Sequence, residues 1–93
     1  MSAARSSLLL IIFAAVLATT SIADAAPSCQ QLWAARNSIY KARGYCFKTD
    51  RAIRYFGNGG CRYKDEDAIP FTDGDRMRIA EITRSERMRG CGG

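Results

Sequence analysis

The side chains that could carry out chemistry in this 93-residue chain are mainly arginines and carboxylates. The sequence contains no histidine, which excludes Ser-His and Cys-His nucleophilic pairs and removes imidazole as a metal ligand. The adjacent acids at residues 65–67 are typical of a solvated loop, and Asp73 and Asp75 suit the first turn of a helix. We therefore expect no catalytic residue, no metal site and no cofactor, and we expect the protein not to be an enzyme.

Arginine is the dominant cation of the chain. Lys and Arg number 14 against 9 acids, which gives a net charge of +5. Because a guanidinium holds a phosphate or carboxylate through two parallel hydrogen bonds, this composition favours a module that binds an anionic partner. The simpler interpretation is a solvated surface in which the arginines balance the acids. The arginines that follow the N-terminal segment are Arg36, Arg43, Arg51, Arg54, Arg62, Arg76, Arg78, Arg84, Arg87 and Arg89.

Trp33, Asn37 and Tyr40 lie on one flank of a predicted helix, where they could stack on a sugar ring. Together with Arg43 and Arg54 they are the candidate binding residues of the sequence. The competing interpretation places the two aromatic side chains in the core, with the Asn37 amide bound to a loop carbonyl. Both interpretations remain open at the level of sequence.

The N-terminal residues 1–25 are typical of a secretory signal peptide. Arg5 supplies the positive start, residues 8–18 are all apolar, and Ala23-Asp24-Ala25 offers small residues at the cleavage positions. Since a membrane-spanning helix needs about 17–25 apolar residues, the run is too short for a stable anchor. We expect cleavage after Ala25, with cleavage after Ala23 as the alternative, and an exported domain at residues 26–93. Lipidation of Cys29 is disfavoured because it would leave one of three remaining thiols unpaired.

All four cysteines follow the signal segment, and a domain this small needs such covalent cross-links to be stable. Four cysteines allow three pairings. If the two long predicted helices pack antiparallel, Cys29 and Cys91 come to the same end, which leaves Cys46 to pair with Cys61 around the short helix. Wide spacing without a Cys-x-x-Cys pair disfavours zinc.

Three helices are expected, each with a capping residue. Ser28 with Gln31 forms a capping box ahead of a helix that ends at Gly44, Thr49 caps residues 50–56, and Thr72 caps a helix that ends before Gly90. In the short helix, the apolar residues 53 and 56 should share a face, and the loop at residues 58–60 should pack against nothing. The fold class is therefore all-α: a small three-helix domain with long loops and two disulfides.

Arg36 and Glu86 each interrupt the apolar face of a long helix. With Cys29 joined to Cys91, the two charges lie at depths that differ by roughly 3 Å along the helices, given a rise of about 1.5 Å per residue. A buried ion pair explains both residues at once, because charges on inward faces are normally paired.

A set of aromatic, arginine and glycine positions runs through residues 32–47: Leu32-Trp33-x-Ala35-Arg36-Asn37-x-Ile39-Tyr40-x-x-x-Gly44-Tyr45-x-Phe47. This motif resembles the YARHG domain, a small bacterial extracytoplasmic domain, and the resemblance extends through Tyr55-Phe56 to Glu86. The chain reads Tyr40-Lys41-Ala42-Arg43-Gly44 where the family name has a histidine, so it keeps the tyrosine and the glycine alone. The resemblance implies a disulfide-bearing extracytoplasmic domain without implying an activity.

We therefore expect an exported, non-catalytic monomer, periplasmic or extracellular, that binds an anionic cell-envelope polymer, lipid or protein. Nucleic acid is not an expected partner because of the compartment, and residues 26–93 contain no expected transmembrane segment. The alternatives are a structural or interaction partner of a larger envelope protein, or a small enzyme. The sequence names no ligand.

Overall fold

The computed structural model describes residues 26–92, so the predicted signal peptide lies outside the described residues. The helices are α2 (Cys29–Ala42), α3 (Asp50–Phe56), the single 3₁₀ turn η2 (Glu66–Ala68) and α4 (Asp73–Met88). Within this part of the chain, extended pairing is confined to one isolated bridge between Tyr45 and Tyr63. The all-α class with long loops and two disulfides is thereby confirmed.

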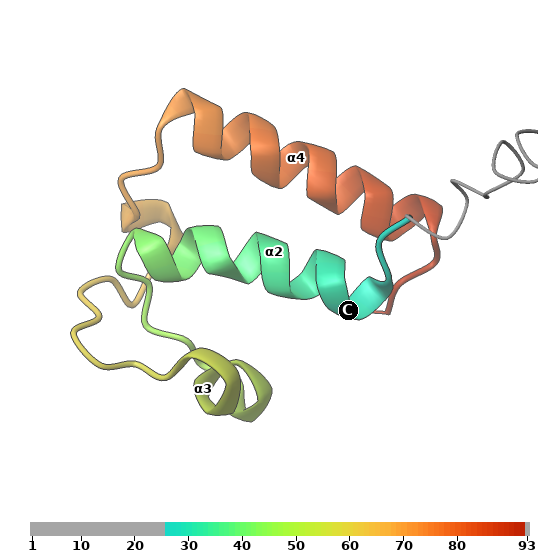
Figure 1. Ribbon diagram of the computed structural model, residues 1–93. Coiled ribbons are helices and arrows are strands. Elements are labelled where there is room, and N and C mark those ends of the chain that lie inside the picture. The colour runs from blue at the N-terminus through green and yellow to red at the C-terminus, as the bar shows by residue number, and fades with distance from the viewer. Residues whose placement is uncertain (1–25, 93) are drawn as a thin grey trace, which may run out of the picture.

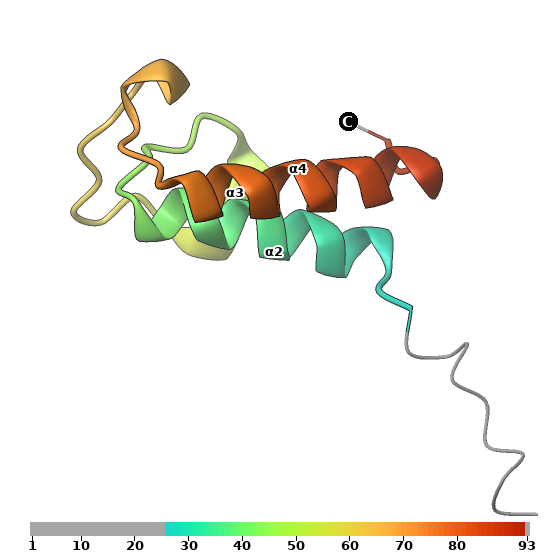
Figure 2. The ribbon, with the colours of Figure 1, turned by 90° about the horizontal axis from the view of Figure 1, so that it is seen from above.

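The two long helices α2 and α4 lie side by side and run in opposite directions (Figures 1 and 2). The short helix α3 packs against α2 on the side away from α4 (Figure 1), and α3 makes no direct contact with α4 within residues 26–92. Because α2 contacts both other helices, it is the central element of the domain.

The helices α2, α3 and α4 each begin directly after the predicted capping residue. The Ser28 hydroxyl accepts a hydrogen bond from the Gln31 amide N–H at 3.1 Å, and the Gln31 side chain accepts one from the Ser28 N–H at 2.8 Å. Thr49 caps α3 through its hydroxyl, and Thr72 caps α4 in a second capping box that Asp75 completes. These bonds satisfy amide groups that have no partner inside the helix, which explains where the chain turns helical.

The core is mainly aromatic. Trp33 of α2 packs with the extended segment after α2, where Tyr45 and Phe47 are buried, and with Ala52 of α3. Of the residues of α3, Ala52 is buried at 4 % exposed, whereas Ile53 is 38 % exposed. The reason lies in the neighbouring rings, because Phe56 of α3 stacks on Phe47 with centroids 5.1 Å apart and this orientation turns Ala52 inward.

Hydrogen bonds to the extended segment after α2 hold the loop that follows α3. The Cys46 N–H donates to the Tyr63 carbonyl at 2.8 Å beside the Cys46–Cys61 disulfide. The expectation that residues 58–60 pack against nothing is wrong for Asn58, whose amide accepts from the Phe47 N–H at 2.8 Å and donates to the Phe47 carbonyl at 2.9 Å. An asparagine amide carries a donor and an acceptor side by side, so it replaces the backbone of a neighbouring strand.

Gly44 is the position where the turn after α2 needs a glycine. Its φ of +90° is unfavourable for L-residues, while a Cβ there would make only van der Waals contact with the Tyr63 ring at 3.4 Å. We predict that Gly44→Ala lowers the free energy of unfolding by about 1–2 kcal/mol, measured by thermal or urea unfolding. The control is Gly59→Ala, where no positive φ is present and no atom lies within 4 Å, so stability should change little. Equal losses at the two sites would contradict this explanation.

Candidate functional site

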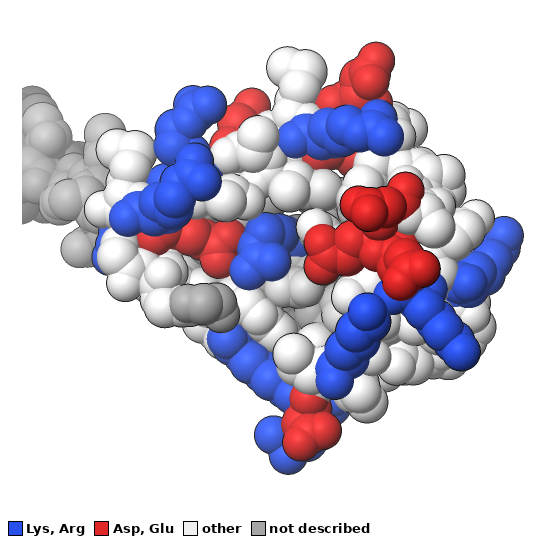
Figure 3. Space-filling view, turned by 180° about the vertical axis from the view of Figure 1, so that it is seen from behind, with Lys and Arg blue, Asp and Glu red and all other residues white. Residues whose placement is uncertain are grey.

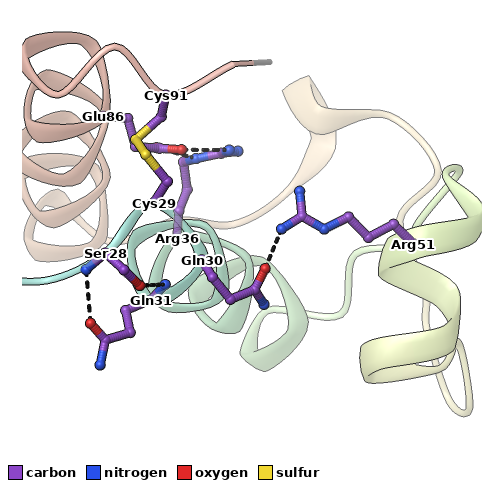
Figure 4. The surroundings of a disulfide bond; sticks show 8 residues. All are labelled: Ser28, Cys29, Gln30, Gln31, Arg36, Arg51, Glu86 and Cys91. Carbon is purple, nitrogen blue, oxygen red and sulfur yellow. Dashed lines mark hydrogen bonds and ion pairs between the residues drawn. A yellow bond between two sulfur atoms is a disulfide. The ribbon is translucent and has the colours of Figure 1, made fainter.

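The Arg36–Glu86 ion pair joins α2 to α4 next to the Cys29–Cys91 disulfide (Figure 4). Arg36 Nε donates to Glu86 Oε1 at 2.7 Å and Arg36 Nη2 donates to Glu86 Oε2 at 3.2 Å, so the pair is bidentate. The hydrogen bond to Glu86 raises the pKa of Arg36, against the opposing effect of burial. The side chains are 24 % and 13 % exposed, so the pair is partly buried where the sequence predicted a buried one. The pair lies between α2 and α4, and both side chains keep part of their surface open to solvent.

A second bidentate pair, Arg43–Asp75, joins the other end of α2 to the start of α4. Arg43 Nε lies 2.6 Å from Asp75 Oδ2, and Arg43 Nη2 lies 3.2 Å from Asp75 Oδ1. The hydrogen bond from Arg43, followed by the backbone hydrogen bond from Thr72, lowers the pKa of Asp75. The sequence analysis assigned Arg43 to ligand binding and missed this contact. The feature of the sequence that could have revealed this contact is the spacing of Arg36 and Arg43. They are seven residues apart and therefore lie on the same side of the helix.

Trp33 and Asn37 are each 8 % exposed, so the structure places them in the core. Asn37 Nδ2 donates to the Trp33 carbonyl of its own helix at 2.9 Å, and the expected bond to a loop carbonyl is wrong. The Arg51 guanidinium covers the Trp33 ring at 3.8 Å from its centroid and also donates to Gln30 (Figure 4). Sequence reasoning missed this cation–π contact, which leaves Trp33 covered where a sugar would have to stack.

Arg54 is exposed on α3, and within residues 26–92 it makes no ion pair or side-chain hydrogen bond. Since α3 does not contact α4, Arg54 lies apart from the arginines of α4. The structure therefore does not bring the five candidate binding residues of the sequence into one site. Arg43 lines one hollow with Arg62, Trp33 and Asn37 line a second with Arg36, and Tyr40 lines a groove with three arginines of α4.

We call this groove the arginine groove; its volume is about 390 Å³. Tyr40 and Phe71 form its aromatic wall, with ring centroids 5.0 Å apart, and burial raises the pKa of the Tyr40 hydroxyl. Three arginines of α4 lie along it. On the face seen in Figure 3, Lys and Arg side chains lie at both ends of the edge that α4 forms, with acidic and uncharged side chains among them. The lining residues are Tyr40, Phe71, Arg76, Ile79, Ala80, Thr83, Arg84 and Arg87.

The three arginines of the groove differ in the hydrogen bonds and ion pairs that they make within the protein. Arg76 donates to the Phe71 carbonyl at 3.0 Å and lies 3.7 Å from the fully exposed Asp73 carboxylate. Arg84 and Arg87 make no ion pair and no side-chain hydrogen bond with residues 26–92. The groove therefore presents two uncommitted guanidinium groups beside one that is anchored, an arrangement suited to phosphate or carboxylate oxygens.

The described residues lack a candidate metal cluster, a free cysteine and a helix that could span a membrane. Residues 26–92 contain no cluster of three or more cysteine or acidic side chains that could hold a metal ion, and both cysteine pairs are disulfides. The Cys29–Cys91 and Cys46–Cys61 bonds are those expected from the helix ends. No described helix is both long enough and apolar enough to span a bilayer.

Comparison with known proteins identifies the family. The profile of the YARHG domain matches residues 10–87, which is most of the chain, and the chain belongs to the YARHG domain family. No curated protein and no solved structure matches the sequence. This family has no assigned molecular function, and the paired cysteines fit an exported protein.

A double-mutant cycle tests the Arg36–Glu86 pair. We expect Arg36→Met and Glu86→Leu each to lower the free energy of unfolding by about 1–3 kcal/mol, because each leaves a partly buried charge without its partner. The double variant should recover much of that loss, since an apolar pair of similar volume needs no partner. The matched control is Arg78→Met with Glu81→Leu, an exposed pair 3.7 Å apart whose coupling should stay below about 0.5 kcal/mol. Additive losses for Arg36 and Glu86 would show that they are not coupled.

The lowered pKa of Asp75 predicts a pH-dependent contribution to stability. Because an aspartate in the unfolded chain titrates near about 3.9, the contribution is fully present above that pH and is lost as the pH falls toward the lower folded-state pKa. We expect Asp75→Asn, which keeps a capping oxygen, to lower the Tm at about pH 7 and to approach the wild-type Tm at about pH 2. Calorimetry at both pH values measures this difference. A Tm difference that stays constant with pH would contradict the role of the Asp75 charge.

Proposed function

We propose that the protein is an exported, non-catalytic binding module that holds anionic groups of a cell-envelope component in the arginine groove. The observation that carries this proposal is the convergence of Arg76, Arg84 and Arg87 beside the rings of Tyr40 and Phe71. A planar guanidinium forms paired hydrogen bonds to phosphate or carboxylate oxygens, and its weak hydration lowers the cost of binding. The proposal includes removal of residues 1–25 on export.

The acids of α4 support the proposal by their positions. Asp75 and Glu86, which could otherwise neutralise the groove, are bound to Arg43, directly after α2, and to Arg36 of α2. Their negative charges are neutralised between the helices, so Arg84 and Arg87 remain available to a ligand. The Tyr40 hydroxyl, whose pKa is raised by burial, is protonated near neutral pH like that of any tyrosine, so it can donate a hydrogen bond to an anionic oxygen.

Calorimetric titration with soluble polyanions tests this function. The probes are long-chain inorganic polyphosphate for phosphate and polygalacturonate for carboxylate. We expect Arg84→Gln with Arg87→Gln to weaken binding of at least one probe about tenfold, a loss of about 1.4 kcal/mol that is reasonable for two charge-assisted contacts.

The matched control is Arg54→Gln with Arg62→Gln, which removes the same charge from exposed positions outside the groove. This variant should bind within about twofold of the wild type, because long-range charge is screened at physiological salt. Equal weakening in both double variants would assign the binding to net charge and contradict a groove. The control also tests the sequence-based assignment of Arg54 as a binding residue.

A further inference from the structure

The outer ridge of α4, which we define as Met77, Arg84 and Met88, faces away from α2. These positions are seven and four residues apart and therefore fall on one face of the helix. Met77 is 66 % exposed and Met88 is 81 % exposed, the two highest values among the large apolar side chains described. At a rise of about 1.5 Å per residue, the two methionines are roughly 16 Å apart along α4 with Arg84 between them.

The charges around the ridge are mostly positive. Arg76 and Arg87 flank it on the groove side. Of the four acids on α4, two face α2 and are bound there, as described above. The remaining two are Asp73 and Glu81, which lie 3.7 Å from Arg76 and Arg78 of the same helix. The outer face of α4 thus carries exposed apolar side chains within an excess of arginine.

We propose that this ridge docks on an anionic lipid surface, with Met77 and Met88 inserted at the interface and Arg84 at the headgroups. An interfacial helix combines apolar side chains on one side with basic residues that attract anionic lipid, and α4 offers both on its solvent face. The proposal rests on the proposed function, because Arg84 also lines the arginine groove.

Lipid is favoured over a folded protein partner by the shape of the ridge. A protein interface is built around a central buried cluster of side chains that fills a pocket. Here the two methionines are separated along a convex helix by a charged residue. A fluid bilayer accommodates isolated, flexible apolar side chains while arginine extends its guanidinium to the headgroups, so it matches this pattern.

Vesicle binding of the exported protein tests the proposal. Vesicles of equal parts phosphatidylglycerol and phosphatidylcholine are sedimented with the wild type, with Met77→Gln plus Met88→Gln, and with the conservative variant Met77→Leu plus Met88→Leu. All three proteins are recovered after export, so they share one N-terminus. We expect the glutamine variant to lose about tenfold in partition coefficient and the leucine variant to bind like the wild type.

The polyphosphate titration separates this proposal from the proposed function, because neither methionine lines the groove. Loss of vesicle binding with unchanged polyphosphate affinity in the glutamine variant would support ridge docking. Unchanged vesicle binding in that variant would overturn it and leave the groove intact. Equal binding to phosphatidylcholine alone would overturn the anionic surface. A methionine-dependent dimer without vesicle binding, seen by analytical ultracentrifugation, would assign the ridge to a second copy of the chain.

Discussion

The fixed antiparallel register of α2 and α4 is the constraint on which the rest of the molecule depends. Three cross-links along the helix pair set this register: one disulfide and two ion pairs. On α2 and its C-terminal cap they begin at positions 29, 36 and 43, a seven-residue spacing that keeps them on one face. Their partners on α4 and beyond it follow in reverse order. The cross-links are Cys29–Cys91, Arg36–Glu86 and Arg43–Asp75.

This register also decides which charges of α4 are available. Helix α4 is bound to α2 through its acids, and its unpaired arginines, Arg84 and Arg87, are left on the outer side. A slip of one residue would rotate α4 by about 100° and separate both ion pairs. The disulfide opposes such a slip at one end, and the Thr72 capping box fixes the start of α4 at the other. The interactions that stabilise the fold therefore also generate the basic surface on which the proposed function depends.

Two residues kept from the family name have structural positions in this chain. Tyr40 packs edge-on against Tyr45 and Phe71, so it links α2 to the segment after it and to the segment before α4. Gly44 accepts, through its carbonyl, the N–H groups of Arg62 and Tyr63 at 2.7 and 3.0 Å. Where the family name has a histidine, this chain has Arg43, whose guanidinium binds Asp75.

The sequence by itself determined the features that rest on local chemistry or on covalent reach. Caps at Ser28, Thr49 and Thr72 were predictable because each hydroxyl binds an amide only three residues away. The three-helix class followed from apolar periodicity and glycine stops. The disulfide pairing and the Arg36–Glu86 contact followed from one assumption, antiparallel packing of the long helices.

The tertiary structure alone decided which side chains from distant parts of the sequence contact one another. Arg43 was free to bind a ligand or an acid until the fold placed Asp75 within 2.6 Å of it. Trp33 was a candidate stacking platform until Arg51, eighteen positions later (33 to 51), covered its ring. The arginine groove likewise combines α2, the segment before α4 and α4 itself. Such arrangements depend on the relative rotation of packed helices, which is set by the fit of the whole core and which no local sequence pattern records.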